Sequence, residues 1–276
     1  MILFSKGIRL AGLTIFVCFV ISCFSEDMKV PPEINGLILE AIQRVSSQRL
    51  SNTISDLQAF KTRYTWQKQE DVAHYLFDHL RTLGLHVVFD EYHWKGKKWK
   101  NVIGTIEGKE NLDGVYMVIA HYDSTSEQPE ECAPGADDNA SGTAALLEIA
   151  RALQALRAKY TVVFALFSNE EQGHRGSIHF AKMARRRVLD IKGVINLDLI
   201  GYNDPIGSLT KRKGLVGAVR LKLKAIRNHL FKLLYPHGIV TVAGRHPNRA
   251  LVKTTSLLSR QYSNLRINDV VSDDCA

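Results

Sequence analysis

The stretch VYMVIAHYD, residues 115–123, is a continuous apolar run that ends in a histidine and an aspartate. Two more apolar runs follow, Thr161–Phe167 and Val194–Leu197, and acidic residues come shortly after each. Strands that are covered on both faces are apolar throughout instead of alternating with polar residues. Between the first two runs, Ser141–Leu156 carries apolar residues on one helical stripe. This succession of strand, helix and strand predicts an α/β fold whose central sheet is mainly parallel and flanked by helices on both faces.

The residues before this unit predict helices and then a hairpin. Apolar residues recur at helical spacing in Ile34–Phe60, which predicts one or two helices, and in Glu70–Leu83, which predicts another. Leu85–Tyr92 and Trp99–Glu107 have the character of strands and flank a KGKK segment, where glycine permits a tight turn. We therefore expect a hairpin to precede the parallel strands.

The N-terminus has the pattern of a secretory signal peptide. Lys6 and Arg9 precede an uncharged apolar run, Leu10–Ile21, which is too short to span a bilayer comfortably. We expect residues 1–22 to be removed and the protein to be periplasmic, extracellular or lipid-anchored at the cell envelope. The anchor would be Cys23, because the segment VISC resembles a bacterial lipobox, and lipidation stays open on sequence alone.

The composition indicates one large domain with a basic C-terminal region. The chain has 276 residues and is 45% hydrophobic, which is enough for a single domain over residues 31–276. The formal net charge is +8, and Pro205–Asn268 holds thirteen Lys or Arg and no acid. In Leu215–Leu234 and Arg249–Tyr262 the charges alternate with apolar residues at helical spacing, which is typical of solvated helix faces. Nucleic acid is therefore not expected as a partner, and the sequence does not give the oligomeric state.

The residues that follow the apolar runs are of the types that bind metal ions. In open α/β sheets, ligands gather beyond the carboxyl ends of the strands. The candidates are His121 and Asp123 after the first run, Glu170 and Glu171 after the second, Asp198 after the third, and Asp137 and Asp138 in the loop before the predicted helix. So many carboxylates at one edge would repel one another without a cation. Zn²⁺ accepts mixed nitrogen and oxygen ligands and activates a water, although Mn²⁺ or Co²⁺ could substitute.

Spacing suggests a division of roles among these residues. His121 would bind the metal through one ring nitrogen, and Asp123, two residues on, would orient the other nitrogen. Of the adjacent glutamates, one would bind the metal and the other would act as general base. Spacing alone does not decide which of Glu170 and Glu171 does which.

Each of these residues also has a purely structural explanation when it is taken alone. Asp137 and Asp138 could be turn residues, with Asn139 or Ser141 capping the helix that follows. A lone His121 at a strand end would be a satisfied hydrogen-bonding group. The conjunction at one sheet edge favours the metal, and Asp137 is left as a loop residue or an outer partner.

Other histidines and cysteines are not promoted to ligands. His174 and His179 are expected on a helix surface. Cys132 is expected to be an incidental neighbour of the aspartate loop. Whether it pairs with Cys275 stays undecided, because the two cysteines lie far apart in the sequence and do not form a pattern that requires a disulfide bond.

Four short motifs occur in order along the chain: AHYDS, APGADDNASG, FSNEEQG and NLDLIGY. In order and spacing they resemble those of the co-catalytic zinc aminopeptidases typified by bacterial leucyl aminopeptidase, to which the glutaminyl cyclases are related. The resemblance covers Leu50–Ala276. It implies a three-layer sandwich of the zinc-exopeptidase type.

The resemblance also implies roles for single residues. His121, Asp138 and Asp198 would surround one zinc, and Asp138 would bridge to a second zinc bound by Glu171. Glu170 would be the general base that activates the bridging water. The peptide bond after the bridging aspartate would be cis.

The sequence departs from the family's pattern at its end. In the family, the second zinc also takes a histidine well downstream of a Ser-Asp-His-like motif, and Val271–Ala276 ends within that motif. His229, His237 and His246 come too early to match. We expect one complete zinc site and a second that is weak or empty, because metal affinity falls with ligand count. We also expect the family's last strand and helix to be missing.

The expected function is removal of N-terminal residues from peptides by attack of metal-activated water, with Glu170 moving the proton to the leaving amine. The missing histidine would impair this activity. Two alternatives stay open: single-zinc chemistry of the glutaminyl cyclase type, and a non-catalytic relative that binds an anionic partner through its basic face. The preferred N-terminal residue is not readable from the sequence.

Overall fold

The computed structural model describes residues 32–156, 158–201, 239–245 and 266–272. The expected signal peptide and Cys23 lie outside the described residues, as does Cys275. The helices expected in Leu215–Leu234 and Arg249–Tyr262 lie outside them too. Within the described part of the chain, none of the helices has the length and apolar character needed to cross a membrane.

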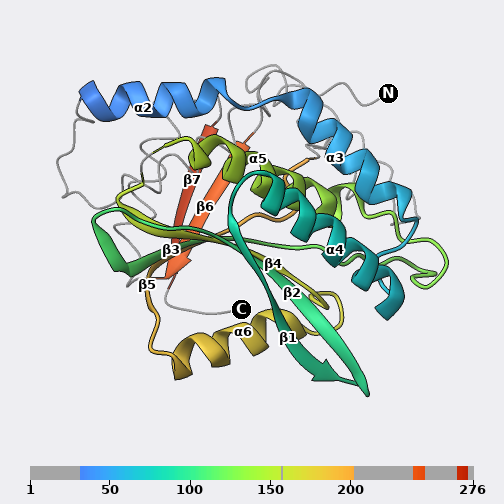
Figure 1. Ribbon diagram of the computed structural model, residues 1–276. Helices are drawn as coiled ribbons and strands as arrows, with labels where there is room; N and C mark the ends of the chain where they lie inside the picture. The colour runs from blue at the N-terminus through green and yellow to red at the C-terminus, as the bar shows by residue number, and fades with distance from the viewer. Residues whose placement is uncertain (1–31, 157, 202–238, 246–265, 273–276) are drawn as a thin grey trace.

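A five-stranded sheet forms the centre of the fold (Figure 1), in the order β1-β2-β4-β3-β5. The strands are β1 (His86–Trp94), β2 (Lys97–Ile106), β3 (Asn111–His121), β4 (Tyr160–Phe167) and β5 (Asp190–Asn196). β3 pairs in parallel with β4 and β5, whereas β2 is antiparallel to both of its neighbours. Four of the five strands therefore run in one direction, which confirms the mainly parallel sheet.

β1 and β2 form the predicted hairpin, but its turn is tighter than the four-residue segment expected. Only Lys95 and Gly96 lie between the strands, with φ angles of 48° and 69°. A two-residue turn with positive φ at both positions matches the twist of the flanking strands. Glycine adopts this conformation without steric cost, which explains its place at the second position.

Helices cover both faces of the sheet (Figure 1). The helices on one face are α2 (Pro32–Gln43), α3 (Ser47–Ala59), α4 (Trp66–Thr82) and α5 (Gly142–Gln154), and α6 (Arg175–Arg186) lies on the other. The first predicted helical stretch is thus two helices. Ser46 begins the second of them, because its side chain accepts the backbone N–H of Arg49 and satisfies an otherwise free donor. The three layers agree with the sandwich that the motifs predicted.

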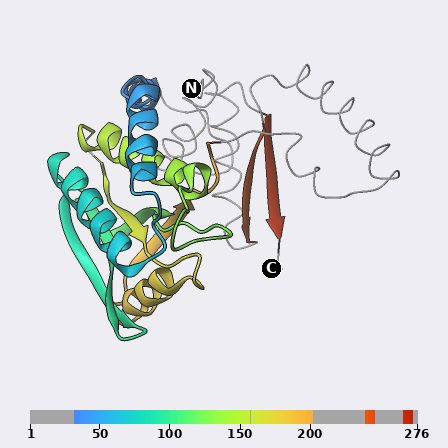
Figure 2. The ribbon, with the colours of Figure 1, turned by 90° about the vertical axis from the view of Figure 1, so that its right-hand side faces the viewer.

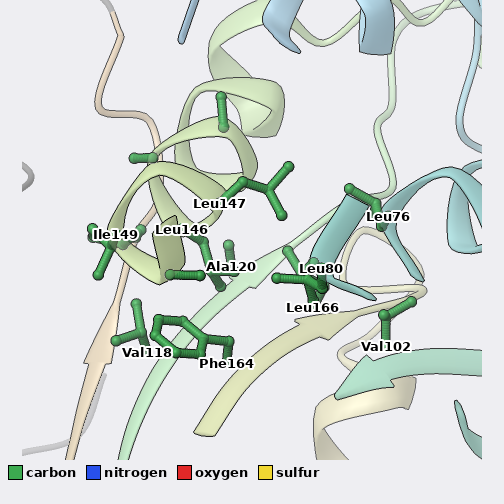
Figure 3. Close-up of a cluster of buried hydrophobic side chains, with 14 of the residues drawn as sticks. Leu76, Leu80, Val102, Val118, Ala120, Leu146, Leu147, Ile149, Phe164 and Leu166 are labelled. Atoms are coloured by element: carbon green, nitrogen blue, oxygen red, sulfur yellow. The ribbon is translucent and has the colours of Figure 1, made fainter. Parts of the chain in front are cut away.

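The apolar strands supply side chains to two cores at once. Val118 and Phe164 belong to the large core beneath α4 and α5 (Figure 3). Their neighbours along the strands, Met117 and Ala165, belong to a smaller cluster against Phe180 of α6. Burying one such large side chain contributes about 1.5–3 kcal/mol. The need to be apolar on both faces is the reason that the runs are continuous.

α6 follows the glutamate pair, where a helix surface was expected around His174 and His179. A second sheet was not predicted from the sequence: β6 (Ile239–Arg245) pairs in parallel with β7 (Arg266–Ser272) as a separate two-stranded sheet (Figure 2). The expectation of a missing last strand and helix stays a prediction.

Candidate metal centre

Three side chains from three separate elements meet at the carboxyl edge of the sheet. His121 ends β3, Asp138 lies in the π-helical turn η1 (Ala136–Ser141), and Asp198 follows β5. His121 Nε2 is 3.2 Å from Asp138 Oδ1 and 3.5 Å from Asp198 Oδ1. One potential ligand atom from each residue lies within 4.8 Å of the others. The structure therefore brings together the three residues that the motifs assign to one zinc.

Electrostatics and hydrogen bonding both indicate a missing positive charge at this point. The carboxylate oxygens Asp198 Oδ1 and Glu171 Oε1 are buried and have no hydrogen-bond partner among the described residues. Burial alone would lower the pKa of His121, but Asp123 and Asp198 outweigh it and raise the pKa to about 10. Burial also raises the pKa of Asp138. The charge of His121 opposes this rise, and the charge of Asp198 adds to it. Buried polar atoms without partners are rare in native proteins, and bound metal is a common explanation.

The loop that carries Asp138 is held by its neighbour Asn139. The peptide bond between these two residues is cis, as the resemblance implied. The side chain of Asn139 donates to the carbonyl of Leu197 at 2.8 Å and accepts the backbone N–H of Gly142 at 2.9 Å. It thereby caps α5 and ties the loop to the end of β5, one residue before Asp198. One buried amide thus fixes two of the three candidate ligands relative to each other.

Asp123 has a second role beyond the one predicted. It lies 3.4 Å from His121 Nδ1, an ion-pair distance without a hydrogen bond. Its two carboxylate oxygens accept the backbone N–H groups of Glu170 at 3.0 Å and Glu171 at 3.1 Å. Asp123 is fully buried. It therefore connects the imidazole to the glutamate pair, and its orientation of His121 as a metal ligand stays a prediction.

The two glutamates lie in different environments, although they are adjacent. Burial raises the pKa of Glu171 to about 7, with further contributions from Asp138 and Asp123. Glu170 instead contacts the side chain of His174, 2.8 Å from Oε1 to Nδ1. Glu171 is partly buried and its Oε1 atom lacks a hydrogen-bond partner, which fits a metal ligand, whereas the partnered Glu170 fits a group that stays off the metal. The roles of the two glutamates stay a prediction.

A fully buried arginine braces the aspartate loop from behind. The guanidinium of Arg63 donates to the carbonyls of Tyr122, Pro134 and Gly135 at 2.7–2.9 Å, and to Leu57 at 3.2 Å. Burial lowers its pKa to about 10, against the pull of Asp123 and other nearby carboxylates. Gly135 has a φ of 46°, and a Cβ there would collide with the carbonyl of Asp138 and with Arg63. The loop can therefore pass this close to the arginine only with glycine at this position.

The remaining candidates lie outside the cluster of ligands. Asp137 accepts the backbone N–H of Gly201 at 2.7 Å and the hydroxyl of Ser141, so it is a loop residue as expected. His179 lies on α6 and pairs with Asp90 at 3.2 Å. Cys132 is exposed and unpaired among the described residues. His229, His237 and His246 lie outside the described residues, as do the residues of the expected second-zinc motif from Asp273 onward.

A buried polar network behind the glutamates was missed by the sequence analysis. Gln69 of α4 exchanges hydrogen bonds with Asn169, which also donates to the hydroxyl of Tyr92 at 2.8 Å. Tyr92 in turn bonds the hydroxyl of Ser168. Asn169 has a φ of 53°, a conformation that asparagine tolerates better than most residues. The asparagine in the SNEE segment is a sequence signal for a bend at this position. Its partners on α4 and β1, Gln69 and Tyr92, carry no sequence signal that would link them to it.

The residues present fit a zinc ion. They offer one imidazole nitrogen and carboxylate oxygens, a donor set that zinc sites use, and the buried oxygens Asp198 Oδ1 and Glu171 Oε1 lack a hydrogen-bond partner. The described residues assemble one such group of three.

Comparison with known proteins shows which family part of the chain resembles. The family model "Peptidase family M28" matches residues 101–231. That stretch is similar to the M28 peptidases. A "Probable zinc metalloprotease" of Pyricularia oryzae is 41% identical over 107 residues, which are 38% of this chain and 21% of that protein. The matched region thus spans about a fifth of that curated relative.

Solved structures of low sequence identity share the fold. LapA of Legionella pneumophila, described as an aminopeptidase, has a TM-score of 0.66 at 18% identity, over 90% of this chain and 61% of that chain. A glutaminyl cyclase of Bacteroides thetaiotaomicron has a TM-score of 0.50 at 16% identity, and the match covers 83% of this chain and 85% of that chain. The resemblance inferred from the four motifs is confirmed, and so is the α/β exopeptidase fold.

Proposed function

We propose that this protein is a zinc-dependent aminopeptidase, which removes N-terminal residues from peptides. The observation that carries the proposal is the junction of His121, Asp138 and Asp198 at one sheet edge, beside a glutamate pair whose backbone is held by a buried carboxylate. The family match supports zinc-dependent peptidase chemistry, and the shared fold with the LapA aminopeptidase supports the exopeptidase type.

The residues divide the work of hydrolysis among them. His121, Asp138 and Asp198 would hold a zinc, which supplies a Lewis acid and an activated water when bound. Glu170 has its backbone fixed by Asp123 and its side chain off the ligand cluster, so it can accept a proton and return it to the leaving amine. Glu171 would bind a second metal or assist the first. The acidic surroundings also suit the positively charged N-terminus of a peptide.

The test is turnover of a panel of aminoacyl chromogenic substrates by the zinc-loaded chain, with metal content measured per chain. Glu170→Gln should lower kcat by about 10²–10⁴-fold while zinc content stays unchanged, because general base catalysis is worth about that factor. Glu170→Gln with full metal-dependent activity would overturn the assignment. No metal and no turnover in the native chain would favour the non-catalytic binding protein.

One observation favours a second candidate, single-zinc chemistry of the glutaminyl cyclase type. The described residues assemble one group of three ligands, and a glutaminyl cyclase shares the fold. Cyclisation of peptides with N-terminal glutamine, without release of free amino acids, would distinguish this activity from the aminopeptidase.

Export remains part of the proposal. We infer from residues 1–22 and from Cys23 that the protein acts outside the cytoplasm, either free or lipid-anchored at the cell envelope. Radiolabelled palmitate that enters the native chain and not a Cys23→Ser variant would establish the anchor. Export without label would indicate ordinary signal-peptide cleavage.

A further inference from the structure

An exposed group of cations surrounds two tryptophans at the hairpin turn. Lys95 Nζ lies 4.4 Å from the ring centre of Trp94, and Arg175 Cζ lies 5.5 Å from the same ring. Lys97 Nζ lies 4.9 Å from the ring centre of Trp66. The three cationic residues are exposed. We call Lys95, Lys97 and Arg175 the basic tip.

None of the three cations of the basic tip forms an ion pair with a residue that the structure describes. The neighbouring Lys98, by contrast, pairs with Glu91 at 3.1 Å. Trp66 Nε1 donates to the carbonyl of Lys98, and the ring of Trp94 lies 5.6 Å from that of Trp99. The cations therefore rest on aromatic rings that have contacts of their own, and their charge is not neutralised by an ion pair within the described residues.

The basic tip lies at the same edge of the sheet as the metal centre. Val102 of β2 pairs with Leu166 near the end of β4, so the residues of β2 before Val102 extend past the carboxyl end of β4 (Figure 1). Arg175 is fixed to the glutamate loop itself. Its backbone N–H donates to the carbonyl of Asn169 at 3.0 Å, and its Nε donates to the carbonyl of Gln172 at 3.2 Å. Arg175 thus connects the basic tip to the residues on either side of Glu170 and Glu171.

The two neighbouring charge patterns suggest how a peptide would be oriented. The metal centre is acidic and suits a positively charged N-terminus, while the basic tip beside it suits negative charge. We propose that the basic tip binds acidic side chains downstream of the N-terminal residue, so that peptides acidic at those positions are the preferred substrates. This inference rests on the proposed aminopeptidase function and specifies its substrate class.

The test compares two peptides that share their N-terminal residue and differ in carrying glutamates or glutamines at the third and fourth positions. With the zinc-loaded chain, kcat/KM for the glutamate peptide should be about tenfold higher at low salt, mainly through KM. This advantage should shrink to about twofold in about 0.5 M salt, because exposed charges are screened there. Equal kcat/KM for both peptides at low salt would overturn the inference.

Variants connect the effect to the basic tip. Replacing Lys95, Lys97 and Arg175 together by glutamine should lower kcat/KM for the glutamate peptide about tenfold and leave the glutamine peptide within about twofold. The matched control is Lys109→Gln, an exposed lysine in the loop between β2 and β3, which should change neither value. An equal loss for both peptides in the triple variant would also overturn the inference, because it would indicate general damage to the glutamate loop.

Binding separates this inference from the proposed function. Calorimetry with the Glu170→Gln variant should show tighter binding of the glutamate peptide, lost in the triple substitution. If the native chain hydrolyses neither peptide but this binding difference is present, the aminopeptidase proposal fails and the acidic-peptide site stands. If the triple substitution abolishes binding to phosphatidylserine vesicles and leaves peptide binding unchanged, the basic tip is a membrane contact and the inference fails.

Discussion

The two loops that carry the candidate metal centre are braced by buried charges of opposite sign. The aspartate loop, residues 133–141, presents its carbonyls to the guanidinium of Arg63. The glutamate loop, residues 168–174, presents its N–H groups to the carboxylate of Asp123. In each case a buried charge holds main-chain atoms, and the reactive side chains are left free for ligand and substrate. The comparison teaches that the site is positioned through the backbone, by charges that need not touch the metal.

The largest effect is expected from removing the brace of the aspartate loop. Arg63→Ala leaves four buried carbonyls without a donor, so the free energy of unfolding should fall by about 3–5 kcal/mol. The Arg63→Lys variant should have a free energy of unfolding between those of the native and Arg63→Ala proteins, because a single ammonium cannot reach all four carbonyls. Urea denaturation followed by tryptophan fluorescence measures both. The control is Arg81→Ala, an exposed arginine that pairs with Asp78 at the surface and should cost less than about 1 kcal/mol.

A zinc titration extends the test to function. If Arg63 positions Asp138, the Arg63→Lys protein should bind zinc about tenfold more weakly even where it is fully folded. Mutation of residues that hold metal ligands in place typically lowers metal affinity by about this factor. Unchanged zinc affinity in a folded Arg63→Lys protein would limit the arginine to a structural role.

The brace of the glutamate loop should matter somewhat less. Asp123→Asn turns one acceptor into a donor that faces a backbone N–H, which should cost about 2–3 kcal/mol of stability. Because Glu170 and Glu171 shift with the loop, kcat should also fall by at least about tenfold. Asp78→Asn, at an exposed position, is the control. An Asp123→Asn enzyme with native kcat would show that the two braces are not equivalent.

The unmatched charges of the site predict an unusual pH dependence for the metal-free protein. The pKa of His121 is raised to about 10, so its stabilising protonation is complete below about pH 6.5 and is lost as the pH rises through about 10. The pKa of Glu171 is raised to about 7, and its contribution is lost over the range from about 4.5 to 7. Both signs agree, so Tm of the metal-free protein should fall by a few degrees between about pH 5 and pH 9.

Zinc should counteract this fall of Tm with pH. Metal ligands bind in their deprotonated forms, so zinc affinity rises with pH and the increase in Tm caused by zinc should be larger at about pH 8 than at about pH 6. Scanning calorimetry with chelator and with zinc at the two pH values measures the difference. A metal-free Tm that rises with pH would contradict the raised pKa values and hence the missing cation.

The cluster of candidate ligands could be predicted from the sequence because two independent rules locate it. Continuous apolar runs identify strands that are buried on both faces, and parallel strands bring their carboxyl ends to one edge. His121 and Asp198 follow such strands, and Asp138 lies in the loop before the buried helix α5. The motifs then supplied the roles that spacing left open between Glu170 and Glu171.

The braces could not be predicted, and the reason is physical. Arg63 and Asp123 bond main-chain atoms of segments 71 and 47 residues away, and a main-chain partner leaves no trace in the residue type at the other end. The start of α6 could not be predicted either, although a helix surface was expected at His174 and His179. The helix begins after the left-handed His174 without a side-chain cap, so the sequence carries no start signal there.

The smallest effect is expected from the surface pair of the glutamate loop. His174 contacts Glu170 at 2.8 Å, but its side chain is 64% exposed, and exposed pairs contribute about 0–1 kcal/mol. His174→Ala should therefore change Tm by less than about 3 °C and kcat by less than about threefold. The same assays with His174→Gln, which retains a hydrogen-bonding side chain, provide the comparison. If His174→Ala lowered kcat as much as Asp123→Asn while the glutamine variant kept it, the side chain of Glu170 would be positioned from the surface, and the buried carboxylate would hold the backbone alone.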